Sequence, residues 1–260
     1  MTDGLVLHVE RSGRPGGRPL VLINSLGTDL RLWDGVLPAL AERWSVVRHD
    51  KRGHGLSDLA PGIYTIAELA RDLAGLLDRL AVRGAFVVGV SIGGMIAQAL
   101  AAARPDLVGG LVLMSATHKV GQPALWDQRM AAIRAGGIAG MADAILERWF
   151  TADYRSDHPA ELAIWRNMLT RTPVEGYLGC CAAIRDADLT EGTRRIAVPT
   201  LCIAGAHDLG TPPAVVEELA GLIAGARFMV VPDAGHLPFI EQPALVTEAV
   251  LAFAREHGLG

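Results

Sequence analysis

The sequence predicts an α/β domain built around a mostly parallel central sheet. Short apolar runs rich in β-branched residues alternate with longer segments in which apolar residues recur at helical spacing, the pattern of a parallel sheet flanked by helices. Half of the 260 residues are hydrophobic and a fifth are charged, a composition typical of a globular chain long enough to bury a large core.

The predicted elements follow one another in a regular order until residue 115. Strands are expected over 5–10 (an edge strand), 20–24, 44–50, 85–90, 110–115, 198–205 and 226–232, and helices over 66–80, 95–105, 212–224 and 241–256. Between 116 and about 190 the strand rhythm gives way to helical patterns that carry three of the five tryptophans. We therefore expect a core formed by 1–115 and 191–260, with a helical cap inserted over 116–190.

The longest uncharged run, residues 85–103, permits two interpretations. Its 19 residues are long enough for a membrane helix, and Gly89 and Gly93 have the spacing of a helix-packing motif. However, the run changes from the β-branched "AFVVGV" to the Ala-rich "MIAQALAAA" across a glycine-rich hinge, and no second hydrophobic span exists. A buried strand that leads into a buried helix explains this change, so we favour the strand–turn–helix interpretation.

That hinge reads Gly-Val-Ser-Ile-Gly-Gly, the pattern of a turn that exposes a nucleophilic serine between a strand and a helix. The glycines allow close packing around a strained backbone, and the N-terminal amides of the following helix would stabilise a developing oxyanion. We predict that Ser91 is the nucleophile.

A serine hydroxyl needs a base to accept its proton, and the base needs an acid that orients it. Asp208 follows one late strand and His236 follows the next, which is the chain order that such a turn requires. Each residue taken alone has a structural interpretation, Asp208 as a helix cap and His236 as a turn histidine, but their order after Ser91 favours a triad. His207 is expected to face away, because successive side chains leave a strand in opposite directions.

The oxyanion donors are expected to be two backbone N–H groups. Ile92 begins the helix after Ser91, and Leu26 lies in the loop after the strand at 20–24. Arg52 and His54, in the glycine-rich turn over 50–57, could reach the site, but we favour loop scaffolding as their role.

Composition and charge exclude several classes of partner. The formal net charge is −4 and Lys and Arg form no long cluster, so we expect no nucleic-acid or membrane partner. The three cysteines do not form a disulfide framework, and the charged start of the chain is unlike a signal peptide, which together predict a reduced, cytoplasmic protein. No histidine pair has metal-ligand spacing, so neither a metal nor a cofactor is expected.

With these motifs the chain resembles the α/β-hydrolase superfamily over nearly its whole length. Within it, the sequence is similar to the 3-oxoadipate enol-lactone hydrolases of the bacterial β-ketoadipate pathway of aromatic catabolism, in stretches such as "NSLGTDLRLWD", "RHDKRGHGLSD" and "AAIRDADL". Asn24-Ser25 stands where many superfamily members carry His-Gly, which is the most specific mark of the lactonase group.

The resemblance implies the triad Ser91, Asp208 and His236 and a small lactone substrate that carries a carboxylate. We expect Arg185 to bind that carboxylate, with Arg129, Arg134 and Lys119 as further candidates; the alternative is a solvated surface arginine. Trp126 is expected either to form a flat wall against the ring or simply to pack the cap. A homo-oligomer is compatible with the sequence.

Three alternatives remain open at this point: another small ester, lactone or carbon–carbon bond hydrolase, a cofactor-free perhydrolase, and a hydrolase-fold ligand receptor. A haloalkane dehalogenase is disfavoured, because its turn carries Asp in place of Ser91.

Overall fold

The computed structural model describes residues 4–260 and contains one seven-stranded sheet in the order β1-β3-β2-β4-β5-β6-β7. β1 runs antiparallel to β3, and every other neighbouring pair is parallel. The strands are β1 Val9–Gly13, β2 Pro19–Ile23, β3 Ser45–His49, β4 Ala85–Val90, β5 Val108–Met114, β6 Thr200–Gly205 and β7 Arg227–Val231. The predicted α/β class with a mostly parallel sheet is thus confirmed.

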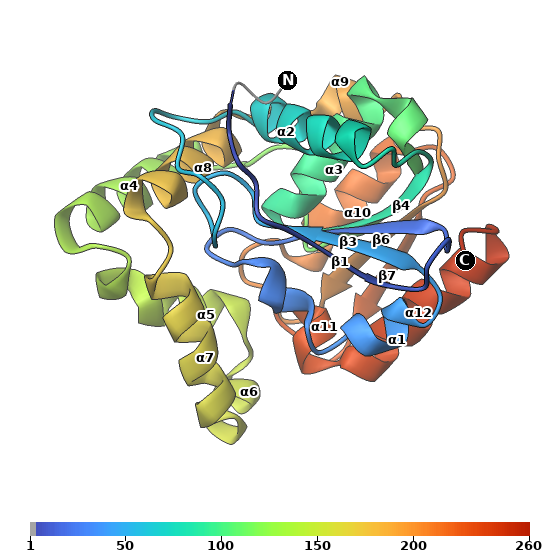
Figure 1. Ribbon diagram of the computed structural model, residues 1–260. Coiled ribbons are helices and arrows are strands. Elements are labelled where there is room, and N and C mark those ends of the chain that lie inside the picture. Colours follow the sequence, from blue (N-terminus) through green and yellow to red (C-terminus); the bar gives the residue numbers. More distant parts are fainter. Residues whose placement is uncertain (1–3) are drawn as a thin grey trace.

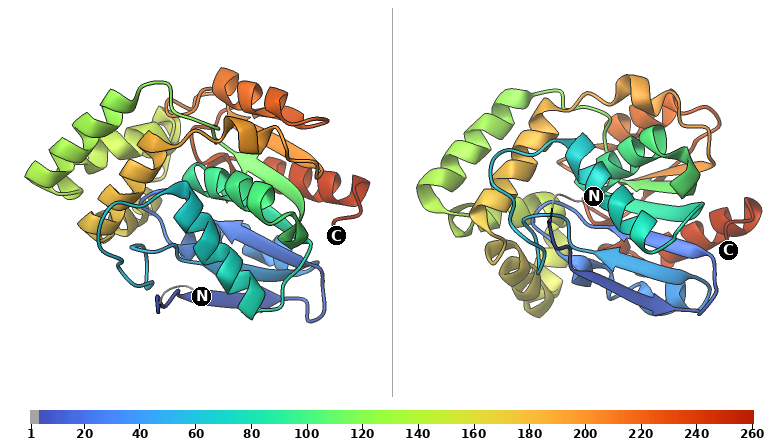
Figure 2. Two further views of the ribbon diagram at one scale, coloured as in Figure 1. Left: turned by 90° about the horizontal axis from the view of Figure 1, so that it is seen from above. Right: turned by 45° about the horizontal axis from the view of Figure 1, so that its top comes forward.

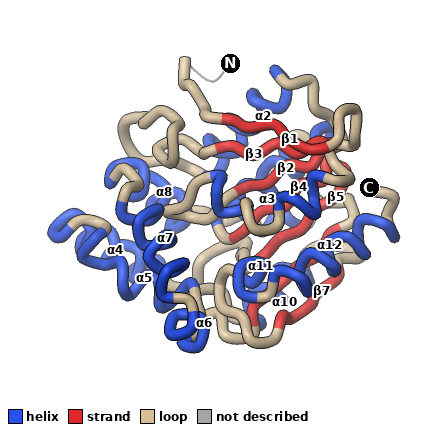
Figure 3. Tube along the Cα trace, turned by 60° about the horizontal axis from the view of Figure 1, so that its bottom comes forward, coloured by secondary structure: helices blue, strands red, loops and turns tan. Residues whose placement is uncertain are grey.

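Helices cover both faces of this sheet (Figures 1 and 3). α2 and α3 pack side by side on one face, whereas α1 and α12 cover the other. The helices outside the predicted cap are α1 Leu37–Ala41, α2 Ile66–Arg79, α3 Ile92–Ala103, α10 Pro213–Leu222, α11 Pro238–Glu241 and α12 Pro243–Glu256, with short 3₁₀ turns at Leu30–Trp33 and Pro105–Leu107. Because β4 is covered on both faces, all six of its residues are buried, which explains its unbroken apolar run.

Local sequence signals set several of these boundaries. α2 begins with a capping box, in which the Glu68 N–H donates to Thr65 Oγ1 and the Thr65 N–H donates to Glu68 Oε2. α3 ends at Ala103, two residues before Pro105, which cannot continue a helix. In the described residues, no helix has the length and apolar character needed to cross a bilayer, so the membrane interpretation of 85–103 finds no support.

The first strand differs from the prediction, since it forms over 9–13 and not over 5–10. Its residues are half-buried or exposed, so their hydrophobicity does not mark the strand. Its position is fixed by pairing with β3, where Glu10 lies opposite Arg48 and accepts a hydrogen bond from it at 2.7 Å.

The predicted cap, residues 116–190, is helical and lies beyond one end of the sheet (Figure 2). Its helices are α4 Pro123–Gly136, α5 Ala142–Trp149, α6 Ala152–Asp157, α7 Pro159–Thr170 and α8 Val174–Asp186, with a 3₁₀ turn at Ala139–Met141, and α9 Thr190–Thr193 begins at its end. The two ends of this insertion meet, because the Leu189 N–H donates to the His118 carbonyl at 2.9 Å and Lys119 forms a β-bridge with Asp188.

The fold leaves a crevice at the carboxyl ends of β2 and β4. These strands are neighbours, but the chain leaves β2 for β3 on one side and leaves β4 for β5 on the other. Ligands of open α/β sheets bind at such switch points. The loop with Leu26 and the turn with Ser91 both emerge there.

The turn between β4 and α3 depends on backbone contact that only glycine permits. A Cβ atom on Gly89 would lie 2.4 Å from the Gly93 carbonyl oxygen, and one on Gly93 would lie 2.2 Å from the Ile23 carbonyl oxygen of β2. Any larger residue must therefore push the helix away from the sheet.

We predict that Gly93→Ala lowers the free energy of unfolding by about 1–3 kcal/mol, because main-chain atoms cannot move aside as a flexible side chain can. Gly136→Ala on α4 is the matched control, since a Cβ there meets no atom within 4 Å, and we expect it to stabilise by up to about 1 kcal/mol. Urea unfolding measures both. Equal stabilities for Gly93→Ala and the wild type would contradict this account of the turn.

Candidate active site

Ser91 occupies a strained turn that lifts its side chain out of the sheet. Its φ of 58° and ψ of −121° lie in a region that L-residues rarely adopt. The Ser91 N–H donates to the Met114 carbonyl at 2.9 Å, and the Ser91 carbonyl accepts from the Gly94 N–H at 2.9 Å. These bonds to β5 and α3 hold the conformation, and Ser91 lines the cavity described below.

The structure brings the predicted base and acid into contact. His236, in the loop between β7 and α11, has Nδ1 2.8 Å from Asp208 Oδ2, and the two residues are only 8% and 3% exposed. Burial raises the pKa of Asp208, but His236 and the hydrogen bonds from Thr211 outweigh it and hold this pKa below its usual value. A charged Asp208 favours the tautomer with its proton on Nδ1, which leaves the His236 Nε2 lone pair available as a base.

The loop that carries His236 is bonded to the insertion. The His236 N–H donates to the Trp149 carbonyl at 2.9 Å. The Glu241 carboxylate accepts the N–H groups of Gly235 at 2.5 Å and of Thr151 at 2.7 Å. The base is therefore fixed by main-chain contacts from the end of α5 and the start of α6 as well as by Asp208.

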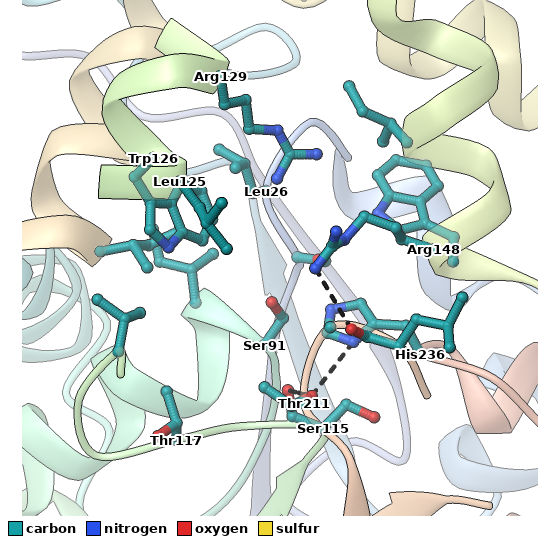
Figure 4. A pocket seen from close by; sticks show the side chains of 18 of the residues that line it. Leu26, Ser91, Ser115, Thr117, Leu125, Trp126, Arg129, Arg148, Thr211 and His236 are labelled. Atoms are coloured by element: carbon teal, nitrogen blue, oxygen red, sulfur yellow. Dashed lines mark hydrogen bonds between the residues drawn. The ribbon is translucent and has the colours of Figure 1, made fainter. Parts of the chain in front are cut away.

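Ser91 and His236 share one cavity of about 930 Å³ between the sheet and the insertion (Figure 4). Leu26 and Ile92, the residues whose N–H groups are the predicted oxyanion donors, are also among those that line it. α4 and α5 supply the opposite walls, with Trp126, Arg129 and Arg148 among the lining residues. The volume suits a small molecule.

The turn over 50–57 supports the Leu26 loop from behind, in agreement with the sequence interpretation. The Gly27 N–H, next in the chain after the Leu26 N–H, donates to His54 Nε2 at 3.0 Å. The Gly27 N–H therefore already has an acceptor within the protein. Burial keeps the pKa of His54 well below its ordinary value, which keeps Nε2 free to accept. Arg52 forms a two-bond ion pair with Asp72 of α2, at 2.5 and 2.7 Å.

The structure does not place Arg185 in the cavity, contrary to the expectation for the carboxylate-binding residue. Arg185 is absent from the cavity lining. Its guanidinium donates to Asp127 at 2.6 Å and to Asp186 at 2.7 Å. With two carboxylates beside it, Arg185 is neutralised at the surface where α8 meets α4. His207 likewise lies on a separate surface pocket, away from Ser91, as expected.

Arg129 takes the position that was expected of Arg185. It extends from α4 into the cavity, where its guanidinium carbon lies 5.3 Å from the ring centre of Trp126 and 5.8 Å from that of Tyr177. Its Nε is buried and has no hydrogen-bond partner in the described chain. A buried donor without an acceptor points to a ligand that supplies one.

A second cavity arginine, Arg148 of α5, was not predicted. It lines the same cavity and donates to the Leu209 carbonyl at 3.3 Å (Figure 4). No sequence signal distinguishes it, because an arginine on a polar helix face is ordinarily solvated.

In the part of the chain that the structure describes, no cluster of three or more His, Cys, Asp or Glu side chains is placed to hold a metal ion. The three cysteines are free and buried.

Comparison with known proteins gives consistent matches. Residues 18–243 match the family model described as "alpha/beta hydrolase fold". The chain is 32% identical to 3-oxoadipate enol-lactonase 2 of Acinetobacter baylyi, over 95% of this chain and 92% of that protein.

Solved structures agree with this match. The enol-lactonase of Burkholderia xenovorans is 40% identical with a TM-score of 0.94, over 97% of this chain and 98% of that one. A thermophilic esterase of Thermogutta terrifontis, solved with malate bound, is 30% identical with a TM-score of 0.91, over 97% and 94% of the two chains. The chain belongs to the alpha/beta hydrolase fold family.

Proposed function

We propose that the protein is a serine hydrolase that opens the ring of 3-oxoadipate enol-lactone to release 3-oxoadipate, through an acyl-enzyme on Ser91. Three observations support the proposal. His236, which contacts Asp208, shares a cavity with Ser91, the cavity contains Arg129 with an unsatisfied donor, and enol-lactonases are similar over nearly the whole chain.

The first half of the reaction forms the acyl-enzyme. Ser91 Oγ attacks the lactone carbonyl while His236 Nε2 takes its proton, and the Leu26 and Ile92 N–H groups donate to the oxyanion. The ring C–O bond then breaks, and the leaving oxygen departs as an enolate, which is a better leaving group than a simple alkoxide. The imidazolium of His236 returns the proton, and tautomerisation to the ketone prevents ring closure.

The second half returns the enzyme to its starting state. His236 takes a proton from a water molecule, whose oxygen attacks the acyl carbon, and the same N–H groups donate to the second oxyanion. The bond between the acyl carbon and Ser91 Oγ breaks, and Ser91 recovers its proton from His236. Asp208 stabilises the imidazolium in both halves.

Arg129 carries the proposal of an anionic substrate. Its partly buried guanidinium has neither a carboxylate nor another hydrogen-bond acceptor among the described residues, although it lines the cavity above Ser91 (Figure 4). A carboxymethyl arm would supply both charge and acceptors. Trp126 lies beside Arg129 and offers a flat surface to the lactone ring.

The first prediction from this proposed function concerns the nucleophile. Loss of enol-lactone absorbance should be rapid with the wild type and slower by at least about 10³-fold with Ser91→Ala, as for removal of other catalytic serines. Ser115→Ala is the matched control, because Ser115 lines the same cavity and its hydroxyl has no partner in the described chain. This control should keep most of the activity.

Two outcomes distinguish an error in the substrate assignment from an error in the nucleophile assignment. If an aryl ester is cleaved through Ser91 while the lactone is untouched, the mechanism holds and the substrate assignment is wrong. If Ser91→Ala retains wild-type turnover, the nucleophile assignment itself is wrong.

The second prediction concerns the carboxylate. Arg129→Gln should raise KM for the lactone about 10- to 100-fold with a smaller change in kcat, since a hydrogen bond to a charged group contributes about 1.5–3 kcal/mol. KM for a neutral aryl ester should change little. Arg185→Gln is the control, because the structure pairs Arg185 with Asp127 and Asp186 outside the cavity. A KM increase confined to Arg185→Gln would restore the sequence-based expectation and refute the role of Arg129.

A further inference from the structure

The peptide unit between Ser25 and Leu26 has two hydrogen-bonding groups with different surroundings. Its N–H belongs to Leu26 and is a proposed oxyanion donor at the cavity. Its carbonyl oxygen, on Ser25, accepts hydrogen bonds from Lys51 Nζ at 2.6 Å and from Thr28 Oγ1 at 2.9 Å. The Lys51 ammonium therefore donates to the carbonyl oxygen of the same peptide unit whose N–H would bind the substrate oxyanion.

The Lys51 ammonium is directed at carbonyl oxygens and not at a carboxylate. Lys51 is only 3% exposed, and its second acceptor is the Thr28 carbonyl at 3.4 Å. In residues 4–260 it forms no ion pair. Asp50 is used by the Leu30 N–H at 2.7 Å and by His8 Nδ1 at 2.8 Å, and Asp29 is paired with Arg31 at 2.6 Å.

We propose that Lys51 is a positioning residue that polarises the Ser25–Leu26 peptide and so strengthens the Leu26 N–H as a donor to the oxyanion. The inference rests on the proposed serine hydrolase function, but not on which ester or lactone is the substrate. Hydrogen bonds in a chain polarise one another, most strongly when one member is charged and the surroundings are poor in water. The oxyanion carries its charge only in the transition state and the tetrahedral intermediate, so the effect should appear in kcat and not in ground-state binding.

The titratable groups around Lys51 make its charge sensitive to pH. Burial lowers the pKa of Lys51 to about 8, an effect that nearby Cys180, Asp50 and Asp29 only partly offset. Burial also lowers the pKa of His49 to about 4 and holds that of His54 well below its usual value, and it raises the pKa of the Cys180 thiol to about 12. These three side chains are therefore neutral around pH 8, where Lys51 itself titrates.

The charge of Lys51 determines how kcat should depend on pH. Below its pKa Lys51 is an ammonium and polarises the peptide, whereas above it the neutral amine is a weaker donor. The kcat for Ser91-dependent turnover should therefore fall as pH rises through about 8. His236 acts in the opposite direction, because a base must be unprotonated to work.

The test compares kcat for hydrolysis of 4-nitrophenyl acetate from about pH 6 to about pH 10 in the wild type, Lys51→Met and Thr28→Val, with Ser91→Ala as the blank. Lys51→Met keeps an unbranched side chain without charge, and we expect kcat to fall about 10-fold at neutral pH, less than for loss of a whole oxyanion donor. The fall in kcat above about pH 8 should disappear in this variant. Thr28→Val removes the neutral hydrogen bond to the same carbonyl and should lower kcat while keeping that fall.

A second measurement separates polarisation from a general structural role. An aryl trifluoromethyl ketone places an oxyanion in the site when Ser91 adds to it, whereas the matching aryl trifluoromethyl alcohol is neutral and cannot be attacked by Ser91. Lys51→Met should weaken binding of the ketone about 10-fold and leave inhibition by the alcohol unchanged. A variant that is merely distorted would weaken both or neither.

Each result decides the inference. A Lys51→Met enzyme with the wild-type kcat, the wild-type pH profile and the wild-type affinity for the ketone contradicts it. Turnover that does not depend on Ser91 overturns the proposed function, and with it the role of Lys51. Ser91-dependent turnover with an unchanged profile overturns the role of Lys51 alone.

Discussion

The contact between main chains at the β4–α3 turn is the constraint on which the site depends. Because Gly93 lies directly against the Ile23 carbonyl of β2, α3 begins close to the sheet, and Ser91 is left at the apex with a positive φ. The same approach places the first amides of α3 beside the loop that follows β2, so the nucleophile and both proposed oxyanion donors arise from two neighbouring strands. Main-chain contacts at this turn therefore set the positions of Ser91 and of the two proposed oxyanion donors.

The insertion contributes to the catalytic machinery as well as covering it. The loop of His236 is held by the Trp149 carbonyl and, through Glu241, by Thr151, so a shift of α5 or α6 would also move the base. Arg129 and Arg148 enter the cavity from the same insertion. The core thus carries Ser91 and His236, and the insertion adds the positive charges of Arg129 and Arg148 to the same cavity.

Much of this was predictable from the sequence, and the exceptions have physical reasons. Buried parallel strands appear as apolar runs, so β2 to β6 lie within one or two residues of their predicted bounds. The apolar but partly exposed edge strand β7 does so too, whereas the polar edge strand β1 is set by its pairing with β3. The order Ser91, Asp208 and His236 follows from the topology. The direction of a side chain on an insertion helix does not, because it depends on how helices pack. Arg185 was expected in the site because it lies near the point where the insertion returns to the sheet, but Asp127 and Asp186 neutralise it, and nothing in the sequence indicated Arg148.

The central claim, that Ser91 is the nucleophile activated by His236, is tested most directly by mass spectrometry after reaction with a fluorophosphonate. Arg104 precedes a proline, where trypsin cleaves poorly, so Ser91 and Ser115 remain on one peptide and fragment ions must locate the adduct. We predict one adduct, on Ser91, that forms far more slowly in His236→Ala. An adduct on Ser115 or elsewhere, or equal labelling with and without His236, would contradict the account.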